Sequence, residues 1–323
     1  RLAVSQPAVT ATETADAQAR AREARGSSAT PTRARFSAPL VLRGHTAQVT
    51  ALAWSPDGTV LASSSGNVAA DGTVDPTVWL WSDSGALLAT LVGHAGAVTS
   101  LAWSPDGRIL ASGSRDGTVR LWRVYGAPLV TLPAAAGQVL SLSWSPDSTV
   151  LAVGSIEPSS DEEASGIVRL FHPDGTLIRS LFTDGGGGKW LHVAWSPDGR
   201  TLAAGAWGFR LWRRDGTLIA SIRRGGSPVP AFAWSPDGQL LAIGNEDGVV
   251  SLYTATGQLV ASVRGVGTVE RLAFSPDNRT LAVLSRDAVW LVDTHDPQAG
   301  SVLVHRHQSL PGFGLAWSPD GRG

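Results

Sequence analysis

The chain has 323 residues, of which 43% are hydrophobic and 16% are charged, with a formal net charge of −1. Such a balance provides no overall field that would attract nucleic acid or an anionic membrane, and no apolar run reaches the roughly 18 residues that a transmembrane helix needs. Because the chain has no cysteine, disulfides, thiolate catalysis and cysteine-ligated metals are excluded.

A segment centred on the motif Trp-Ser-Pro-Asp recurs along the chain. A single compact core rarely exceeds about 250–300 residues, whereas a repeat architecture escapes that limit because each repeat contacts only its neighbours. The spacings between copies run from 39 to 51 residues, which fits a four-stranded propeller blade of roughly 40–45 residues. The aromatic residues of the seven copies are Trp54, Trp103, Trp144, Trp195, Trp234, Phe274 and Trp317.

The first 43 residues precede the first copy and contain three strand-like stretches. Residues 1–5 (RLAVS) resemble the second strand of the repeats, residues 37–43 resemble the fourth, and residues 32–36 are the candidate third strand. Between them, residues 6–31 form an insertion whose Ala-, Arg- and Glu-rich part has good helix propensity. We expect an insertion or a helical excursion there, and a helix leading in from an upstream domain of a larger chain is the alternative.

Four short strands can be followed within the second copy. They cover residues 98–103, 109–112, 119–122 and 129–132. Ser-Pro-Asp-Gly and Asp-Gly turns separate them, since Pro presets φ and Gly tolerates a positive φ. Helical periodicity is absent, so this stretch predicts an all-β unit.

Residues 93–122 contain a complete pattern: Gly-His, a strand, SPDG, LASGS and then Asp-Gly-Thr-Val-Arg-Leu-Trp. This pattern resembles the WD-repeat family, in a bacterial-type form suggested by the abundance of Ala, Gly and Arg, and the resemblance covers about residues 32–323. Gly-His survives only at residues 44–45 and 93–94, and the Asp of the Trp-Asp signature is replaced in most copies. Tol-type and peptidase-associated propellers also use SPDG-rich repeats.

The resemblance implies an all-β, seven-bladed β-propeller with four antiparallel strands per blade, forming one domain over residues 1–323. The last copy supplies only one strand, residues 312–318, before the chain ends. An open ring would leave unpaired strand edges and an exposed blade interface. We therefore expect the last blade to be closed by strands from both termini, with the others coming from residues 1–43.

In the second copy, His94, Ser112, Asp116 and Trp122 resemble the structural tetrad of the family. A His, a Ser and an Asp together also suggest nucleophilic catalysis. No G-x-S-x-G elbow occurs, however, and the Asp lies in a tight turn while the His precedes the first strand. We interpret the four residues as a network that bridges strands within one blade.

Three other polar or glycine-rich segments could be considered as ligand sites, but their patterns do not favour ligand binding. The acidic segment at residues 157–163 lacks the alternating oxygen ligands of a calcium loop. His305 and His307 share one side of an expected strand but have no third metal ligand. The glycines at residues 185–188 lack a phosphate-loop motif. No cofactor, no metal and no catalytic residue is predicted.

Three long insertions, at residues 6–31, 66–76 and 156–166, all fall between the second and third strands of a blade, so we expect them on one face. Binding is commonly placed on variable loops of a rigid scaffold. Trp and Arg are also frequent at interface hot spots. Residues predicted to contact a partner from that face are Arg115, Trp207, Arg223, Arg224, Glu246 and Arg286.

The predicted function is a non-catalytic scaffold for a protein or peptide partner, without nucleic acid or membrane binding, in the cytoplasm; a periplasmic or secreted location is the alternative. A second hypothesis is a propeller that binds a small ligand or carbohydrate, or hydrolyses one, at its central opening. Polar residues converging on the opening would favour it. The expected lining is mostly Ala, Val, Leu and Ser, with His192, Glu270 and Arg271 as exceptions.

Overall fold

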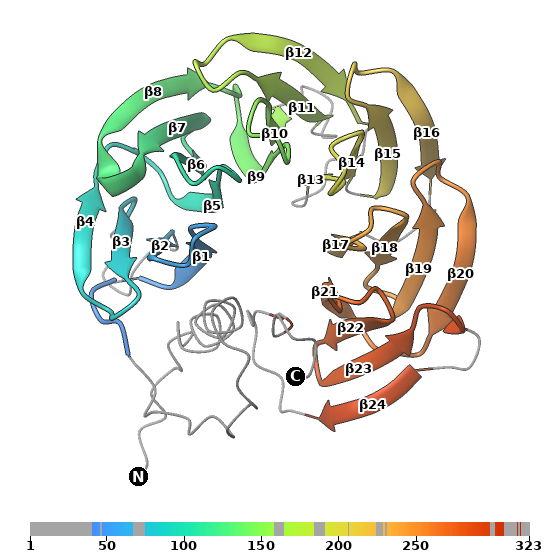
Figure 1. Ribbon diagram of the computed structural model, residues 1–323. Helices are drawn as coiled ribbons and strands as arrows, with labels where there is room; N and C mark the ends of the chain where they lie inside the picture. Colours follow the sequence, from blue (N-terminus) through green and yellow to red (C-terminus); the bar gives the residue numbers. More distant parts are fainter. Residues whose placement is uncertain are drawn as a thin grey trace, which may run out of the picture.

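The strands form six four-stranded antiparallel sheets, each a simple meander in chain order. The computed structural model describes residues 41–45, 47–66, 75–157, 165–183, 191–205, 207–223, 229, 231–297, 301–306, 315 and 317. Figure 1 shows the sheets as blades arranged around a central opening, with the first strand of each blade innermost. We number the blades 1 to 6 in chain order, and within the described residues the all-β prediction is confirmed.

The first three blades contain the N-terminal half of the described strands. Blade 1 contains β1 (Val49–Trp54), β2 (Val60–Ser65), β3 (Val78–Ser82) and β4 (Leu87–Leu91). Blade 2 contains β5 (Val98–Trp103), β6 (Ile109–Ser114), β7 (Thr118–Arg123) and β8 (Pro128–Pro133), with the 3-10 turn η1 (Val124–Gly126) before β8. Blade 3 contains β9 (Gln138–Trp144), β10 (Leu151–Glu157), β11 (Ser165–Phe171) and β12 (Leu177–Phe182).

The other three blades repeat this order, and the innermost strands of blades 4 and 5 have only four residues each. Blade 4 contains β13 (His192–Trp195), β14 (Thr201–Gly205), β15 (Gly208–Arg213) and β16 (Leu218–Arg223). Blade 5 contains β17 (Ala231–Trp234), β18 (Leu240–Gly244), β19 (Val249–Thr254) and β20 (Leu259–Arg264). Blade 6 contains β21 (Val269–Phe274), β22 (Thr280–Ser285), β23 (Ala288–Asp293) and β24 (Ser301–Arg306).

The described sheets number six, where seven blades were expected. Residues 1–40 and most of residues 312–318, which were assigned to the closing blade, lie outside the described residues, as does the insertion at 6–31. The strand expected over residues 37–43 does not extend through its last part, because residues 41–45 form no strand. Closure of the ring is therefore not shown.

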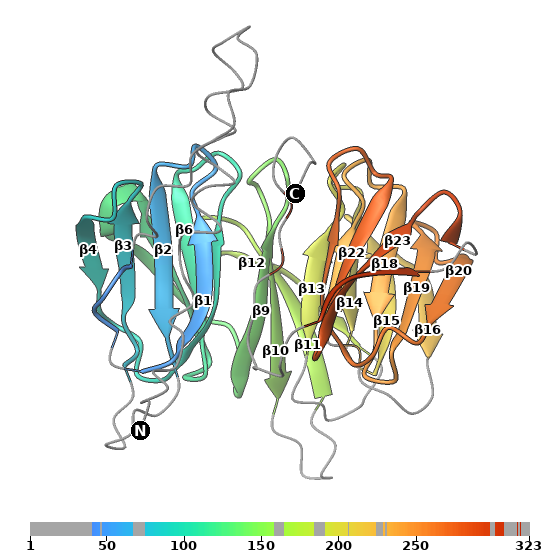
Figure 2. The ribbon, with the colours of Figure 1, turned by 90° about the horizontal axis from the view of Figure 1, so that it is seen from below.

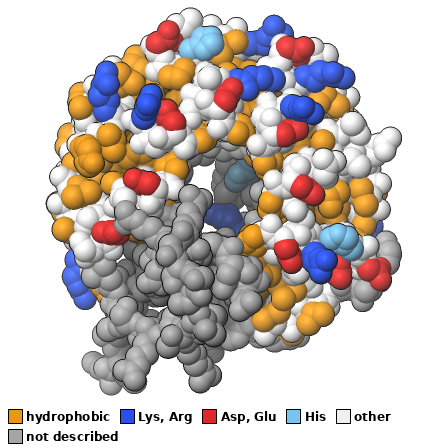
Figure 3. Space-filling view, viewed as in Figure 1, with side chains coloured by type: hydrophobic (Ala, Val, Ile, Leu, Met, Phe, Trp, Pro, Cys, Tyr) orange, Lys and Arg blue, Asp and Glu red, His pale blue; other side chains and the backbone are white. Residues whose placement is uncertain are grey.

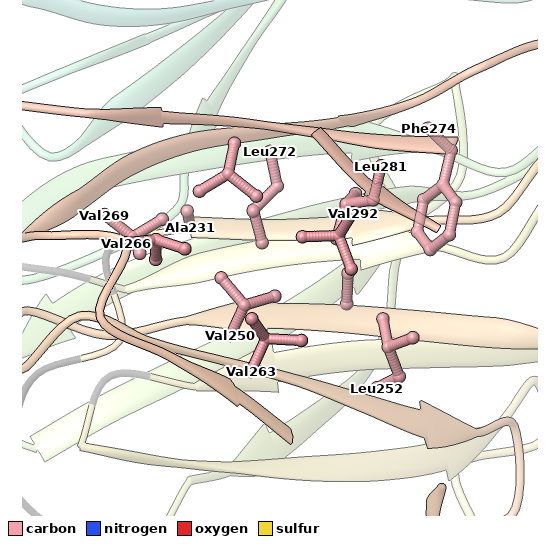
Figure 4. Packing of buried hydrophobic residues seen from close by; sticks show 12 residues of the cluster. Ala231, Val250, Leu252, Val263, Val266, Val269, Leu272, Phe274, Leu281 and Val292 are labelled. Atoms are coloured by element: carbon pink, nitrogen blue, oxygen red, sulfur yellow. The ribbon is translucent and has the colours of Figure 1, made fainter. Parts of the chain in front are cut away.

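Apolar side chains on both faces of the sheets hold neighbouring blades together. Each of five core clusters joins two adjacent blades, so the clusters link blades 1 to 6 in an unbroken series. In the cluster between blades 5 and 6, Val250 and Leu252 of β19 face Val269, Leu272 and Phe274 of β21 (Figure 4). Burial of both faces explains why the second strand of each blade is buried along nearly its whole length, instead of alternating between buried and exposed residues.

A tryptophan at the end of the innermost strand reaches into the preceding blade. The indole Nε1 of Trp103 donates to the backbone carbonyl of Ala53 at 3.1 Å, and Trp144 donates in the same way to Ala102 at 3.1 Å. Trp234 repeats the contact on Ala194 at 3.2 Å. These bonds fix the height of one innermost strand against the next.

The Ser-Pro-Asp turns that follow these tryptophans all lie on one face of the ring, together with the connections between third and fourth strands. In the blade 2 turn, the hydroxyl of Ser104 donates to Asp106 at 2.5 Å and accepts from the amide of Ile109 at 3.0 Å. The connections between second and third strands reach the opposite face (Figure 2). We call these the turn face and the loop face.

The outermost strands form open sheet edges with large exposed aliphatic side chains. In every described blade, the pairing of the third and fourth strands contains a register shift. Such bulges twist an edge away from straight pairing and make it a poor template for an added strand. The exposed residues are Leu87, Leu88, Leu129, Leu177, Ile178, Leu218, Leu259, Val260, Val302, Leu303 and Val304.

Two blades replace the glycine of the Ser-Pro-Asp-Gly turn with a residue that keeps the left-handed backbone. Ser148 has φ 62° and Asn278 has φ 63°. Each side chain accepts a hydrogen bond from the preceding blade. The amide of Asp106 donates to the Ser148 hydroxyl at 3.0 Å, and that of Asp237 donates to Asn278 Oδ1 at 3.0 Å. A backbone conformation that L residues rarely adopt is thus offset by a bond between blades.

Replacing Asn278 by Ala should lower the free energy of unfolding by about 1 kcal/mol, because the variant loses the bond to Asp237 and retains an unfavourable positive φ. Asn278→Gly is the matched control, since glycine also loses the bond but adopts this φ without strain. Equilibrium unfolding in urea should rank the three proteins wild type, Gly variant, Ala variant. An Ala variant as stable as the wild type would contradict this account.

Candidate functional site

Four of the six residues predicted to contact a partner can be placed on the loop face. Arg115, Trp207, Glu246 and Arg286 each lie in the connection between the second and third strands of a different blade, and each is exposed. Arg223 is the last residue of β16, but its side chain is outside the described residues, as is the whole of Arg224. The structure therefore distributes these four around the ring rather than gathering them into one cluster.

Trp207 lies at the tip of the short turn between β14 and β15 and is 39% exposed. The turn is tight, because a Cβ placed on Gly205 would lie 2.0 Å from the carbonyl oxygen of Gly208. Beside it, Thr183, Phe209 and other residues line a small hollow. A large aromatic side chain that is partly exposed on a short connection is suited to contact with another molecule.

The beginning of the acidic segment is held by an ion pair, contrary to the expectation of a solvated loop. Glu157 Oε1 lies 2.7 Å from Arg169 Nη1, and both side chains are mostly buried. The hairpin of β10 and β11 also extends to Glu157 opposite Ser165, so the loop expected from residue 156 begins later. Asp161, Glu162 and Glu163 lie outside the described residues.

The structure brings the four predicted tetrad residues of blade 2 into one hydrogen-bonded chain. Asp116 Oδ2 lies 3.0 Å from His94 Nδ1, and His94 Nε2 lies 2.8 Å from the hydroxyl oxygen of Ser112. Trp122 Nε1 donates to the same hydroxyl at 2.8 Å. The chain joins the connection before β5 to β6, to the turn that follows β6 and to β7, so it ties a loop to two strands of the blade.

Blade 1 contains a second arrangement of this kind that the sequence interpretation missed. His45 contacts Asp75 at 3.3 Å and Ser63 at 2.8 Å, and Trp81 donates to the Ser63 hydroxyl at 2.8 Å. The signal was present, because Asp75 precedes Trp81 by the same six residues that separate Asp116 from Trp122. The insertion between β2 and β3 lengthened the distance from His45 and concealed the match.

The ionisation of these networks follows from burial and hydrogen bonding. Burial alone would raise the pKa of Asp116, but bonds from Thr118, from the amide of Ala95 and from His94 outweigh it and lower the pKa to about 2. For His94 burial has the opposite effect and is the main cause that lowers its pKa, although the hydrogen bond and charge of Asp116 act to raise that pKa. At neutral pH the arrangement is therefore a carboxylate facing a neutral imidazole.

The His–Ser–Asp geometry in blade 2 is unsuited to nucleophilic catalysis. Ser112 is fully buried, and its oxygen already accepts from Trp122 while contacting His94. An attacking hydroxyl must be reachable by a substrate and needs donors placed for the oxyanion. In the folded protein, Ser112 has no such access.

Several other candidate residues lie outside the described part of the chain. They include the glycines at residues 185–188 and His307, while His305 lies in β24 with an undescribed side chain. Among the described residues, no group of three His, Asp or Glu side chains could hold a metal ion. No helix in that part of the chain is long and apolar enough to span a membrane.

Comparison with known families gives matches to β-propeller repeats. The model described as WD domain, G-beta repeat matches residues 37–82, 85–123 and 126–161. The model described as anaphase-promoting complex subunit 4 WD40 domain matches residues 208–266. No curated protein matches the chain in a sequence comparison.

Asp116→Ala should destabilise the protein by roughly 1–3 kcal/mol at pH 7, because the donors of Ala95, Thr118 and His94 lose their acceptor. The loss should shrink in acid. The pKa of Asp116 is lower in the folded than in the unfolded chain, so its stabilisation is complete above about pH 4 and disappears as the pH falls through 2.

Unfolding in urea between pH 7 and pH 2 measures this difference. Asp174→Ala is the control, since among the described residues the exposed Asp174 carboxylate accepts only from the local turn at Thr176, and a change within about 0.5 kcal/mol is expected. A wild type and Asp116→Ala variant of equal stability at pH 7 would show that the network does not stabilise the blade.

Proposed function

Because the chain belongs to the WD-repeat family, we propose that it is a non-catalytic scaffold that binds a protein or peptide partner through its loop face. The observation that carries the proposal is the exposure of Trp207 and three charged residues on the one face where the connections vary between blades. The turn face, in contrast, is built from nearly uniform Ser-Pro-Asp turns. Variable loops on a rigid frame are the usual location of recognition.

The mixed charge of the loop face supports a protein partner over a nucleic acid. Arg115, Glu246 and Arg286 are exposed there, and Arg286 lies 3.9 Å from Glu270. Nucleic-acid binding requires a continuous basic patch that contacts successive phosphates. Alternating charges around a ring instead suit a partner with complementary charges of both signs.

We further propose that residues 1–323 form a single closed propeller of seven blades, with the last blade assembled from both termini and residues 6–31 inserted in it. Trp317 supports this, since its Nε1 donates to the carbonyl of Ala273 at 2.8 Å, the contact that Trp103 makes with Ala53. The innermost strand of a further blade would carry that tryptophan.

The start of the first family match gives independent support. The second and third matches begin at residues 85 and 126, just before β4 and β8, which are the outermost strands of the preceding blades. By the same offset, a match that begins at residue 37 favours an outermost strand that starts near residue 39 in a blade preceding β1, ahead of residues 41–45, which form no strand. The buried Nε1 of Trp54 has no hydrogen-bond partner among the described residues, which is consistent with an acceptor in that blade.

Deletion of residues 1–5 tests the closure. We expect the melting temperature to fall by at least about 5 °C, because the closing blade loses a strand and the interface behind it opens. Deletion of five residues inside the proposed insertion, 16–20, should leave the melting temperature nearly unchanged. Equal melting temperatures for wild type and the deletion of residues 1–5 would reject closure by both termini.

A pair of matched double variants tests the binding face. Trp207→Ala with Arg115→Ala removes an aromatic and a basic side chain from the loop face, whereas Tyr125→Ala with Arg108→Ala removes the same types from the turn face. Cross-linking in cells of the source organism, followed by mass spectrometry, should recover a partner with the wild type and the turn-face variant. We expect the amount of partner recovered with the loop-face variant to be at least about tenfold lower than with the wild type. Loss only with the turn-face variant would refute the proposal.

A further inference from the structure

The connection that enters blade 3, residues 134–137, is held differently from the one that enters blade 2. Counted from the tryptophan that ends each innermost strand, Ala135 stands where blade 2 has His94. By the same count along the second strand, Val153 stands where blade 2 has Ser112. Val153 is fully buried in the apolar core between blades 2 and 3. The described part of blade 3 therefore lacks the hydrogen-bonded chain that crosses blade 2.

One position of the blade 2 network keeps its acid in blade 3. Glu157 follows the leucine of its second strand by six residues, as Asp116 does in blade 2. Asp116 Oδ2 accepts from the amide of Ala95 at 2.9 Å. Glu157 Oε1 lies 3.4 Å from the corresponding donor of the next connection, the amide of Ala136. The two carboxylates therefore reach the same part of the connection that enters their blade.

In blade 3 an arginine replaces the histidine as the partner of this carboxylate. Arg169 Nη1 lies 2.7 Å from Glu157 Oε1, and it donates to the carbonyl of Ala134 at 2.6 Å. The two charged groups thus hold the connection on both sides of Ala135. The guanidinium holds the carbonyl that precedes this alanine, and the carboxylate holds the amide that follows it.

The same connection is tied to the turn between β6 and β7 of blade 2. The amides of Ala134 and Ala135 donate to the carbonyl of Gly117 at 3.2 and 3.0 Å. A Cβ placed on Gly117 would lie 2.6 Å from the carbonyl oxygen of Ala135, so the two segments are in direct contact. Arg115, which is proposed to contact a partner, is exposed in this turn. The connection therefore links a loop-face turn of blade 2 to the charged pair of blade 3.

The pair in blade 3 is ionic, whereas at neutral pH its counterpart in blade 2 joins a carboxylate to a neutral imidazole. On the turn face, acidic and basic side chains lie together in the open (Figure 3), and the pair of Arg214 with Asp147 is 41% and 46% exposed. Arg169 and Glu157 are only 20% and 19% exposed, so their attraction is stronger than that of an open pair. Salt still weakens a partly exposed pair, because the screening length falls from about 10 Å at 0.1 M to about 3 Å at 1 M.

We propose that Glu157 and Arg169 form an ion-pair latch on the loop face, which fixes the connection at 134–137 and, through Gly117, the turn that carries Arg115. Raised ionic strength releases the latch and lets the connection move, whereas the His–Asp network of blade 2 stays in place. The junction of blades 2 and 3 is thus an element of the loop face that responds to charge. Its effect on partner binding rests on the function proposed above, but the latch itself does not.

Hydrogen exchange of single amides, followed by NMR at pH 7 without any partner, tests the latch. The amides of residues 134–136 report on the connection. The amide of Ala95, which Asp116 holds in blade 2, is the internal reference. Raising NaCl from about 50 mM to about 1 M should speed exchange at residues 134–136 by at least about threefold relative to Ala95. An equal response at Ala95, or no response in the connection, would overturn the proposal.

Glu157→Gln keeps an acceptor for the amide of Ala136 but removes the charge. In low salt, exchange in its connection should be at least about threefold faster than in the wild type, and it should no longer respond to NaCl. Arg169→Gln should behave in the same way, whereas Arg169→Lys, which keeps the positive charge, should retain the salt response. Wild-type exchange in Glu157→Gln, or a salt response that persists in it, would reject the latch.

Glu270→Gln is the matched control, since Glu270 also lies near an arginine of the loop face, with its carboxylate 3.9 Å from Arg286. Exchange at residues 134–136 should be the same in this variant as in the wild type. Circular dichroism verifies folding, and the salt series on the wild type decides the question if a neutral variant does not fold. Because no partner is present, a negative result rejects the latch and leaves the loop-face function standing.

Discussion

The contact between one innermost strand and the next is the constraint on which the rest of the structure depends. Each blade is a four-stranded sheet with apolar side chains on both faces, so a blade on its own would expose both apolar faces to water. The indole bonds of Trp103, Trp144 and Trp234 fix the height of one sheet against its neighbour at three of the five described junctions. Trp195 Nε1 has no such bond among the described residues, and blade 6 has Phe274 at this position. With that height fixed, the turns gather on one face and the variable connections on the other.

Much of this could be predicted from the sequence, because each element depends on residues close together in the chain. The Ser-Pro-Asp turns and the strands around them were placed within about two residues in blade 2, where predicted strands at 98–103 and 109–112 correspond to β5 and β6. The main difference is that β6 continues to Ser114, since its pairing with Val98 keeps it in the sheet up to the next turn.

The features that were missed depend on residues far apart. The hairpin of β10 and β11 extends beyond its apolar residues to Glu157, where that residue pairs with Arg169. From the sequence, the acidic residues that follow the apolar stretch resembled a solvated loop. In blade 1, an insertion hid the relation between His45 and Asp75. Contacts between blades, such as Asn278 with Asp237, join residues about one repeat apart and leave no local trace.

The His–Asp networks of blades 1 and 2 bear on where local unfolding of the molecule would begin. The described blades 3 to 6 have no such network, and Ser112 in blade 2 corresponds to Val153 in blade 3. In a repeat protein, each unit contributes its own stability to the array. We therefore expect blades 1 and 2 to be locally more stable than blades 3 to 6. Subglobal opening would begin in blades 3 to 6, and the slowest amide hydrogen exchange would be found in β1–β3 and β5–β7.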